Sequence, residues 1–113
     1  MKNVKITVLR KTMHEDIARE YLTDGVQPCD FFEEGDTFLY TGEAVMPEGF
    51  CPWAWIDIYR NVSALSLGST YTPWQNREGV SILCCTDGVR PVSFLLEAVE
   101  GEPQERQAQP VAG

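Results

Sequence analysis

The hydrophobic and polar positions along the chain predict a sheet with two helices. Residues 3–11 alternate between apolar and other side chains, which is the period of a half-buried strand. One face would carry Val4, Ile6 and Val8, and the other Lys5, Thr7 and Leu9. The segment Thr12-Met13-His14-Glu15 matches a capping box, in which a Thr hydroxyl and a Glu carboxylate satisfy each other's backbone amides. We therefore expect a strand followed by a short helix over about residues 13–22.

A longer helix is predicted in the middle of the chain, after a strand at residues 37–41 whose aromatic and β-branched content suits a sheet. Pro52 stands where a helix tolerates proline best, at its first position. An apolar stripe then recurs at helical spacing and consists of Trp55, Ile58, Val62 and Leu65. Gly68 supplies the expected C-terminal stop, so the helix would present this stripe to the sheet.

A β-hairpin is predicted near the C-terminal end. Residues 80–85 and 92–99 both alternate, and the segment 86–91 between them is a hairpin signal built on Asp87-Gly88. Residues 69–79 show no period and have the composition of an ordered loop.

Together these elements predict an α+β fold. It would contain a mixed or antiparallel sheet of about four strands, one short helix and one longer helix, and the C-terminal β-hairpin. The 113 residues match the usual size of one domain, which we place at residues 1–100. Residues 101–113 are rich in Gly, Pro, Gln and Glu and predict a disordered tail.

The charge balance narrows the range of partners. Seventeen acidic side chains against nine basic ones give a net charge of -8, which repels phosphate backbones and anionic membrane surfaces. Nucleic acid and membranes are therefore excluded as partners, which leaves a small molecule or another protein. The start of the chain does not have the pattern of a signal peptide, and no segment reaches the roughly 20 apolar residues of a membrane span. We expect a cytoplasmic protein whose four cysteines are reduced.

Cys51 is the strongest candidate for a reactive side chain. It comes directly before Pro52, at or beside the N-cap of the longer helix, where free amides and the helix dipole stabilise a thiolate. The alternative is that Cys51 is a small buried hydrophobic residue, since free cysteines are among the most buried residue types. The sequence leaves both interpretations open.

The other cysteines suggest either a partner for Cys51 or a metal site. Cys84 and Cys85 are adjacent in a predicted strand, so their side chains point to opposite faces and at most one of them joins Cys51 without a bulge. A metal site needs about four ligands, and the candidates are Cys29, Cys51, Cys84 and Cys85. No Cys-x-x-Cys knuckle accompanies them, so structural thiols are the competing interpretation.

Three further residues are candidates for binding a ligand or cofactor. Trp53 and Trp74 would line an apolar pocket around Cys51 for a flat small molecule or a partner's side chain, or else belong to the core. Arg90, just past the hairpin turn, could hold a carboxylate or phosphate, or could be an exposed turn residue.

A cysteine nucleophile is a third kind of chemistry, with Cys51 assisted by His14 and by Asp57 or Asp87. The competing interpretations are a solvated His14, an Asp57 on the solvent side of its helix, and an Asp87 that caps backbone amides in its turn. Gly-rich phosphate loops and the Gly-x-Ser-x-Gly and His-Glu-x-x-His motifs are missing from the sequence, which counts against nucleotide-binding proteins, common hydrolases and metalloproteases.

Two motifs are long enough to compare with known families: Gly49-Phe50-Cys51-Pro52-Trp53-Ala54-Trp55, and residues 84–94, which read Cys-Cys-Thr-Asp-Gly-Val-Arg-Pro-Val-Ser-Phe. With them the chain resembles a family of small uncharacterised prokaryotic proteins, over about residues 2–100. Pro28-Cys29 and residues 32–38 also look like that family. The resemblance implies the same four cysteines but no activity, cofactor or partner.

We therefore expect a small thiol-containing domain in which Cys51, assisted by Cys84 or Cys85, forms a redox or metal-linked site beside the aromatic cluster. The alternative is a non-catalytic accessory module that binds a small molecule or a protein and keeps its cysteines as structural residues. The sequence names no cofactor and leaves open whether the chain is an enzyme.

Overall fold

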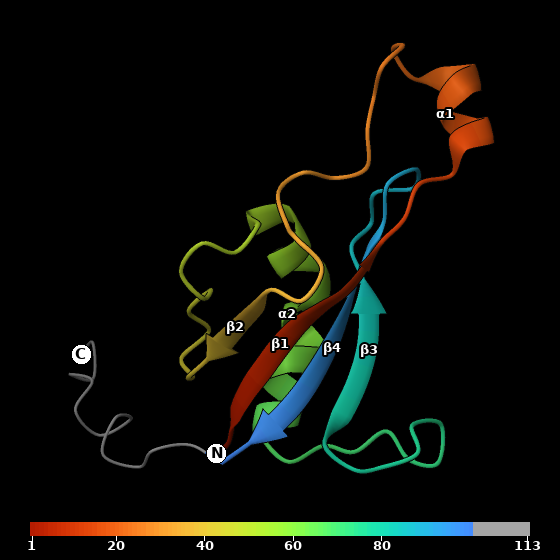
Figure 1. Ribbon diagram of the computed structural model, residues 1–113. Helices are drawn as coiled ribbons and strands as arrows, with labels where there is room; N and C mark the ends of the chain where they lie inside the picture. The colour runs from red at the N-terminus through yellow and green to blue at the C-terminus, as the bar shows by residue number, and fades with distance from the viewer. Residues whose placement is uncertain (101–113) are drawn as a thin grey trace.

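The fold is α+β, as predicted, with a four-stranded antiparallel sheet and two helices (Figure 1). The computed structural model describes residues 1–100, so the predicted disordered tail at 101–113 lies outside the described residues. The elements in chain order are β1 (Asn3–Lys11), α1 (Glu15–Tyr21), β2 (Thr37–Tyr40), α2 (Pro52–Ser66), β3 (Val80–Cys84) and β4 (Val92–Val99). The strand order across the sheet is β2-β1-β4-β3, and β3 and β4 form the predicted C-terminal hairpin.

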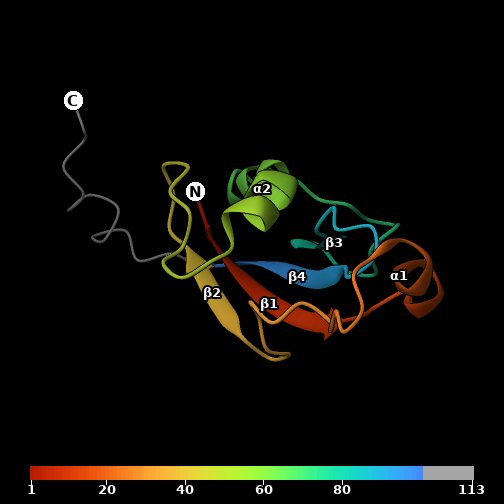
Figure 2. The same ribbon diagram turned by 90° about the horizontal axis from the view of Figure 1, so that it is seen from above.

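The core lies between the sheet and α2, which covers one face (Figure 2). The alternation predicted for β1 is confirmed, because Val4, Ile6 and Val8 are buried on the face that meets the helix. From α2, Ile58, Val62 and Leu65 complete the layer, so the predicted apolar stripe is also confirmed. In the part of the chain that the structure describes, no helix combines the length and apolar character that crossing a bilayer requires.

Phenylalanines fill the end of the core that lies beneath the start of α2. Phe32, in the connection before β2, is buried, and its ring centroid lies 5.1 Å from that of Phe50 and 5.3 Å from that of Phe94. Phe38 contributes a fourth ring at 5.7 Å from Phe32. Through Phe32, this cluster supports a pocket at the N-terminal end of α2.

The longer helix starts and ends where the sequence predicts. Cys51 is the N-cap with an extended backbone, and Pro52 occupies the first turn, where its missing amide proton leaves no hydrogen bond unmade. Gly68 follows the helix with a φ of 99°, a left-handed conformation that favours glycine, and its amide bonds the Leu65 carbonyl at 3.0 Å. The start of the helix is therefore well defined, and it places Cys51 and Trp53 at one end of the sheet.

The short helix differs from its prediction. It spans Glu15–Tyr21, and His14 is the N-cap without a side-chain cap, so the expected capping box is wrong. Thr12 is instead bound to the hairpin, since its amide and hydroxyl both donate to the Pro91 carbonyl, at 3.0 and 3.2 Å. A threonine that still pairs with the sheet cannot turn back to cap a helix. Helix α1 stands away from the sheet as a projection (Figure 1).

Candidate functional site

An open pocket of about 490 Å³ lies at the N-terminal end of α2. Its walls come from three segments that are distant in the sequence: residues 29–32, the start of α2 at 51–54, and the hairpin residues 85–92. Phe32 and Val92, which are buried, form its floor, and Phe31 and Trp53 are exposed at its walls. The pocket is therefore mostly aromatic and aliphatic.

Three of the four cysteines line this pocket: Cys29, Cys51 and Cys85. Each is half-buried, packs against the core cluster and is a free thiol. Cys84 is exposed and does not line the pocket. It pairs with Ser93, and the next pair, Cys85 with Val92, faces the core. Of the two adjacent cysteines, Cys85 thus lines the same pocket as Cys51, and Cys84 does not.

The four cysteines proposed as metal ligands are not brought together as one set. Cys84 lies across the sheet from the other three, because successive side chains of a strand point to opposite faces. Among residues 1–100, no group of three or more His, Cys, Asp or Glu side chains is arranged to hold a metal ion. The pocket thiols are thus close enough to share a cavity without forming a ligand cage.

Cys51 and Cys85 are held in different ways. The Cys51 side chain makes no capping hydrogen bond to α2, so its sulfur is left to the pocket wall. The Cys85 sulfur accepts a hydrogen bond from the Val92 amide at 3.4 Å, while the Cys85 amide donates to the Val92 carbonyl at 3.1 Å. This pair of bonds fixes the Cys85 side chain against β4.

The two tryptophans predicted to flank Cys51 are separated. Trp53 lines the pocket with 64% of its surface exposed, and its indole nitrogen donates to the Thr86 hydroxyl at 2.8 Å. Trp74 is 86% exposed in the loop before β3 and is not part of the pocket. Both residues are tryptophans in the middle of the chain, but only Trp53 lies on an element that borders the site.

Arg90 lies in the pocket wall and is held in place by its neighbours. Its Nε lies 3.3 Å from Asp87 Oδ2, and its Nη1 donates to the Gln27 carbonyl at 3.3 Å. Asp87 is the turn residue that the sequence predicted, since its Oδ1 accepts the amides of Val89 and Arg90 at 2.9 and 2.8 Å. The guanidinium is thereby oriented before any ligand arrives.

The pKa of Asp87 is lowered by its place in this turn. Partial burial by itself would raise it, but the hydrogen bonds from the Arg90 and Val89 amides, together with the Arg90 guanidinium, outweigh that effect. Asp87 is therefore ionised at neutral pH, and Arg90 has a permanent counter-ion.

The nucleophilic arrangement with His14 is not formed around the pocket. His14 is exposed at the start of α1, and it is not one of the lining residues. Asp57 binds Thr86, whose amide donates to Asp57 Oδ2 at 2.8 Å. Asp57 thus holds the hairpin turn against α2 and does not orient an imidazole.

Sequence reasoning missed the contribution of residues 30–32. Asp30 and Phe31 are exposed at the pocket, and Phe32 is buried beneath it. The sequence feature that could have indicated this contribution is the adjacent pair Phe31-Phe32. The pair lies in a turn-rich segment with neither strand nor helix periodicity, so a position in a regular element does not account for its two aromatic rings.

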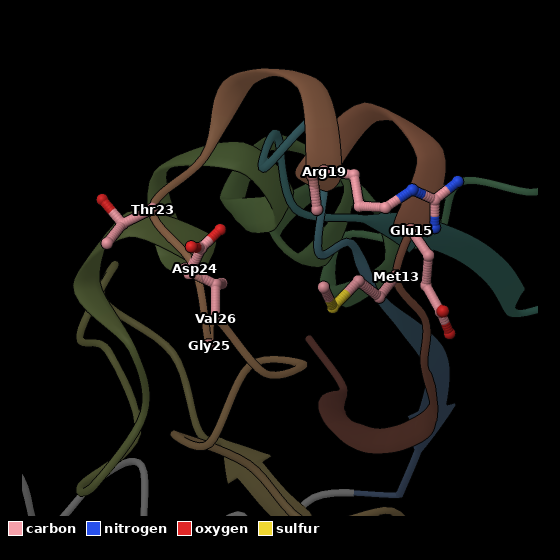
Figure 3. Close-up of a pocket in the computed structure, with 8 residues that line it drawn as sticks. Met13, Glu15, Arg19, Thr23, Asp24, Gly25 and Val26 are labelled. Carbon is pink, nitrogen blue, oxygen red and sulfur yellow. The ribbon is translucent and has the colours of Figure 1, made fainter.

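A second, smaller pocket lies beside α1 (Figure 3). It has a volume of about 140 Å³ and lies between the helix and the segment that returns from it, lined by Met13, Glu15, Ala18, Arg19, Thr23, Asp24, Gly25 and Val26. At this volume it is too small for most organic ligands. The pocket at the start of α2 is therefore the better candidate site.

Comparison of the chain with protein-family models, with curated proteins and with solved structures finds no match. The family resemblance inferred from the two sequence motifs stays a prediction.

Proposed function

We propose that the chain is a binding module whose pocket at the start of α2 holds a small, flat, mostly apolar molecule with an anionic group. The observation that carries this proposal is the meeting of three distant segments around one cavity of about 490 Å³ with aromatic walls and a pre-oriented guanidinium. Small-molecule sites typically have this volume range and combine apolar walls with a few fixed polar groups.

The chemistry of the walls specifies the class of ligand. The rings of Phe31 and Trp53 suit a planar apolar body. Arg90 uses Nε and Nη1 for Asp87 and Gln27, and its remaining N–H groups are available to a carboxylate, sulfonate or phosphate. Asp30 is exposed at the same pocket, so its carboxylate keeps its hydration and adds little repulsion.

A cysteine-based site at Cys51 is the second candidate. It is favoured by the three thiols that line the pocket, because a ligand bound there would lie against Cys29, Cys51 and Cys85. A thiol at a helix N-cap is also open to activation by the free amides of the first turn. In this version the pocket delivers an electrophile or a disulfide to Cys51.

The first experiment uses anilinonaphthalene sulfonate, a planar aromatic anion, as the probe. The four cysteines of the folded protein are labelled with N-ethylmaleimide, and the rate at each site is followed by peptide mass spectrometry. The probe should slow labelling of Cys29, Cys51 and Cys85, and should leave Cys84 unchanged because Cys84 lies outside the pocket. Equal protection of Cys84, or no protection of the other three, would overturn the binding proposal.

A pair of arginine variants tests the anionic part of the proposal. Arg90→Gln should weaken binding of the probe about 10-fold or more, because a charged hydrogen bond is removed. Arg60→Gln is the matched control, since Arg60 is exposed on α2 and does not line the pocket. Equal affinities of the two variants would remove Arg90 from the site.

The same labelling experiment without probe tests the second candidate. A Cys51 rate above that of exposed Cys84 would support an activated thiol, because burial alone makes a cysteine slower. A Cys51 rate below that of Cys84 would reject a nucleophilic role and leave the binding module.

A further inference from the structure

The face of the sheet opposite α2 has an unusual composition. Side chains that point away from the helix come from all four strands, and they include Lys5, Leu39, Ile82 and Leu95. Ile82 is 51% exposed and Leu39 is 48% exposed. Among residues 1–100, the helix that packs against the strands is α2, on the other face (Figure 2).

Such a composition is typical of a sheet that is covered on both sides. An antiparallel sheet with one solvated face normally carries polar residues at its outward positions. Here the register places Leu95 directly beside Ile82, so apolar side chains of β4 and of edge strand β3 adjoin on the open face. The pattern indicates that this face, which we call the open sheet face, is an interaction surface.

The charges on the open sheet face indicate what binds there. Lys5 of β1 and Glu97 of β4 are direct cross-strand neighbours, so the centre of the face pairs one positive and one negative group. Arg77 also lies near Glu97, at 3.5 Å. The whole chain, by contrast, has a net charge of -8. A surface with adjacent opposite charges is complementary to itself when it is rotated by a two-fold axis.

We infer that a second copy of this chain binds to the open sheet face. In the resulting two-fold dimer, the two sheets stack face to face about an axis between β1 and β4, so Leu95 lies near the axis and Ile82, on edge strand β3, lies over the partner's β2. Lys5 lies opposite the partner's Glu97, and Glu97 lies opposite the partner's Lys5, as an isologous interface requires. The pockets lie on the outer sides of the dimer, so the assembly is independent of the proposed ligand.

The dimensions of the open sheet face determine the expected affinity of the dimer. Four strands spaced about 4.8 Å apart and about six residues long present a flat area of roughly 400 Å² per copy. This is below the roughly 800 Å² per partner of a standard interface, so we expect micromolar rather than nanomolar dissociation. Assembly must therefore be measured over a wide range of concentration.

Sedimentation velocity of the full chain from about 5 to 500 µM provides the test. A reducing agent is kept present so that exposed Cys84 cannot link two copies. The wild-type chain should shift from monomer to dimer in this range. Ile82→Lys should raise the dissociation constant at least 10-fold, because it buries a charge in the interface. Ile56→Lys is the matched control, since Ile56 is 76% exposed on α2, and its dissociation constant should not change.

A charge exchange identifies the pairing. Lys5→Glu and Glu97→Lys should each weaken self-association, because like charges then meet across the two-fold axis. An equimolar mixture of the two variants should form a heterodimer, since each negative pair then faces a positive pair. Within each variant chain, residues 5 and 97 carry like charges whether the sample is separate or mixed. A difference between the two samples therefore reports only the contact between copies.

A chain that remains monomeric at every concentration would overturn the inference. So would an Ile82→Lys dimer as tight as wild type, or an Ile56→Lys variant that dissociates, because the interface would then lie elsewhere. Failure of the two charge variants to associate when mixed would reject the two-fold pairing of Lys5 with Glu97. Circular dichroism of every variant checks that the fold is retained.

Discussion

The indole N–H of Trp53 donates a 2.8 Å hydrogen bond to the hydroxyl of Thr86, which joins the first turn of α2 to the β3–β4 turn. Thr86 is held in turn by Asp57, whose Oδ1 and Oδ2 lie 3.2 and 3.1 Å from the same hydroxyl. Two walls of the candidate pocket are thereby tied to each other. The pocket is built before a ligand binds, which reduces the ordering cost of binding.

Replacement of Thr86 by Val should separate these walls. The isosteric change removes the hydroxyl that joins Trp53 to Asp57, and we expect a loss of about 1–2 kcal/mol in the free energy of unfolding. Urea unfolding followed by tryptophan emission measures this loss. Thr37→Val, at an exposed position of β2, is the control and should change stability by less than about 0.5 kcal/mol. Equal stability of the two variants would show that the bridge contributes nothing.

Asp87 should make stability depend on acid pH. Its folded-state pKa is lowered, so its contribution is complete above the unfolded-state pKa and is lost as pH falls through the folded-state pKa, below about pH 4. Asp87→Asn keeps an oxygen acceptor for the turn amides but cannot be ionised. Wild type should therefore be more stable than the variant at pH 7, and the difference should shrink as the pH falls below about 4. Denaturant unfolding at several pH values measures it, and a difference that is constant with pH would contradict the assignment.

The two tryptophans should differ in their effect on the pocket. Trp53→Phe removes the Thr86 hydrogen bond and a large part of one pocket wall, so binding of anilinonaphthalene sulfonate should weaken about 5-fold or more. Trp74→Phe changes a side chain that is 86% exposed and should leave the affinity unchanged. Fluorescence titration measures both affinities. A larger effect at Trp74 would mean that the probe binds elsewhere.

Phe32 should be the most sensitive of the pocket residues for stability. Its ring contacts those of Phe31, Phe38, Phe50 and Phe94. Phe32→Leu leaves a cavity at their centre, and we expect a loss of about 1–3 kcal/mol. Phe31→Leu is the matched control, because the Phe31 ring is exposed, and it should cost much less. Thermal unfolding compares the two, and similar melting temperatures would argue against Phe32 as the centre of the cluster.

Much of the fold could be predicted because local and long-range preferences agree. The alternation of β1, the stripe of α2 and the Asp87-Gly88 turn each specify an element and the face it buries. The predicted capping box does not form because Thr12 has competing hydrogen-bond partners. Its amide and hydroxyl bind the Pro91 carbonyl and do not cap the helix. Short helices with weak packing are decided by such competition, which sequence does not display.

The candidate site was less predictable than the fold. The different positions of Cys84 and Cys85 could be predicted, because side chains alternate between the two faces of any strand. The position of Cys29 at the same pocket as Cys51 depends on the path of a connection without a repeating pattern, and nothing in the sequence specifies that path. Trp74 could not be distinguished from Trp53 for the same reason, because a loop residue carries no periodic signal that shows which way it faces.

The hairpin turn holds the projecting α1 segment at both ends. The His14 backbone amide donates to the Val89 carbonyl at 2.8 Å where the segment leaves the sheet, and Arg90 Nη1 donates to the Gln27 carbonyl where it returns. Arg90 is also the guanidinium of the pocket. Any ligand that draws Arg90 away from Gln27 therefore releases the projection, and by reciprocity any contact that steadies the projection weakens binding of that ligand by the same free energy. Hydrogen exchange at the amides of α1 would report pocket occupancy without a label at the site.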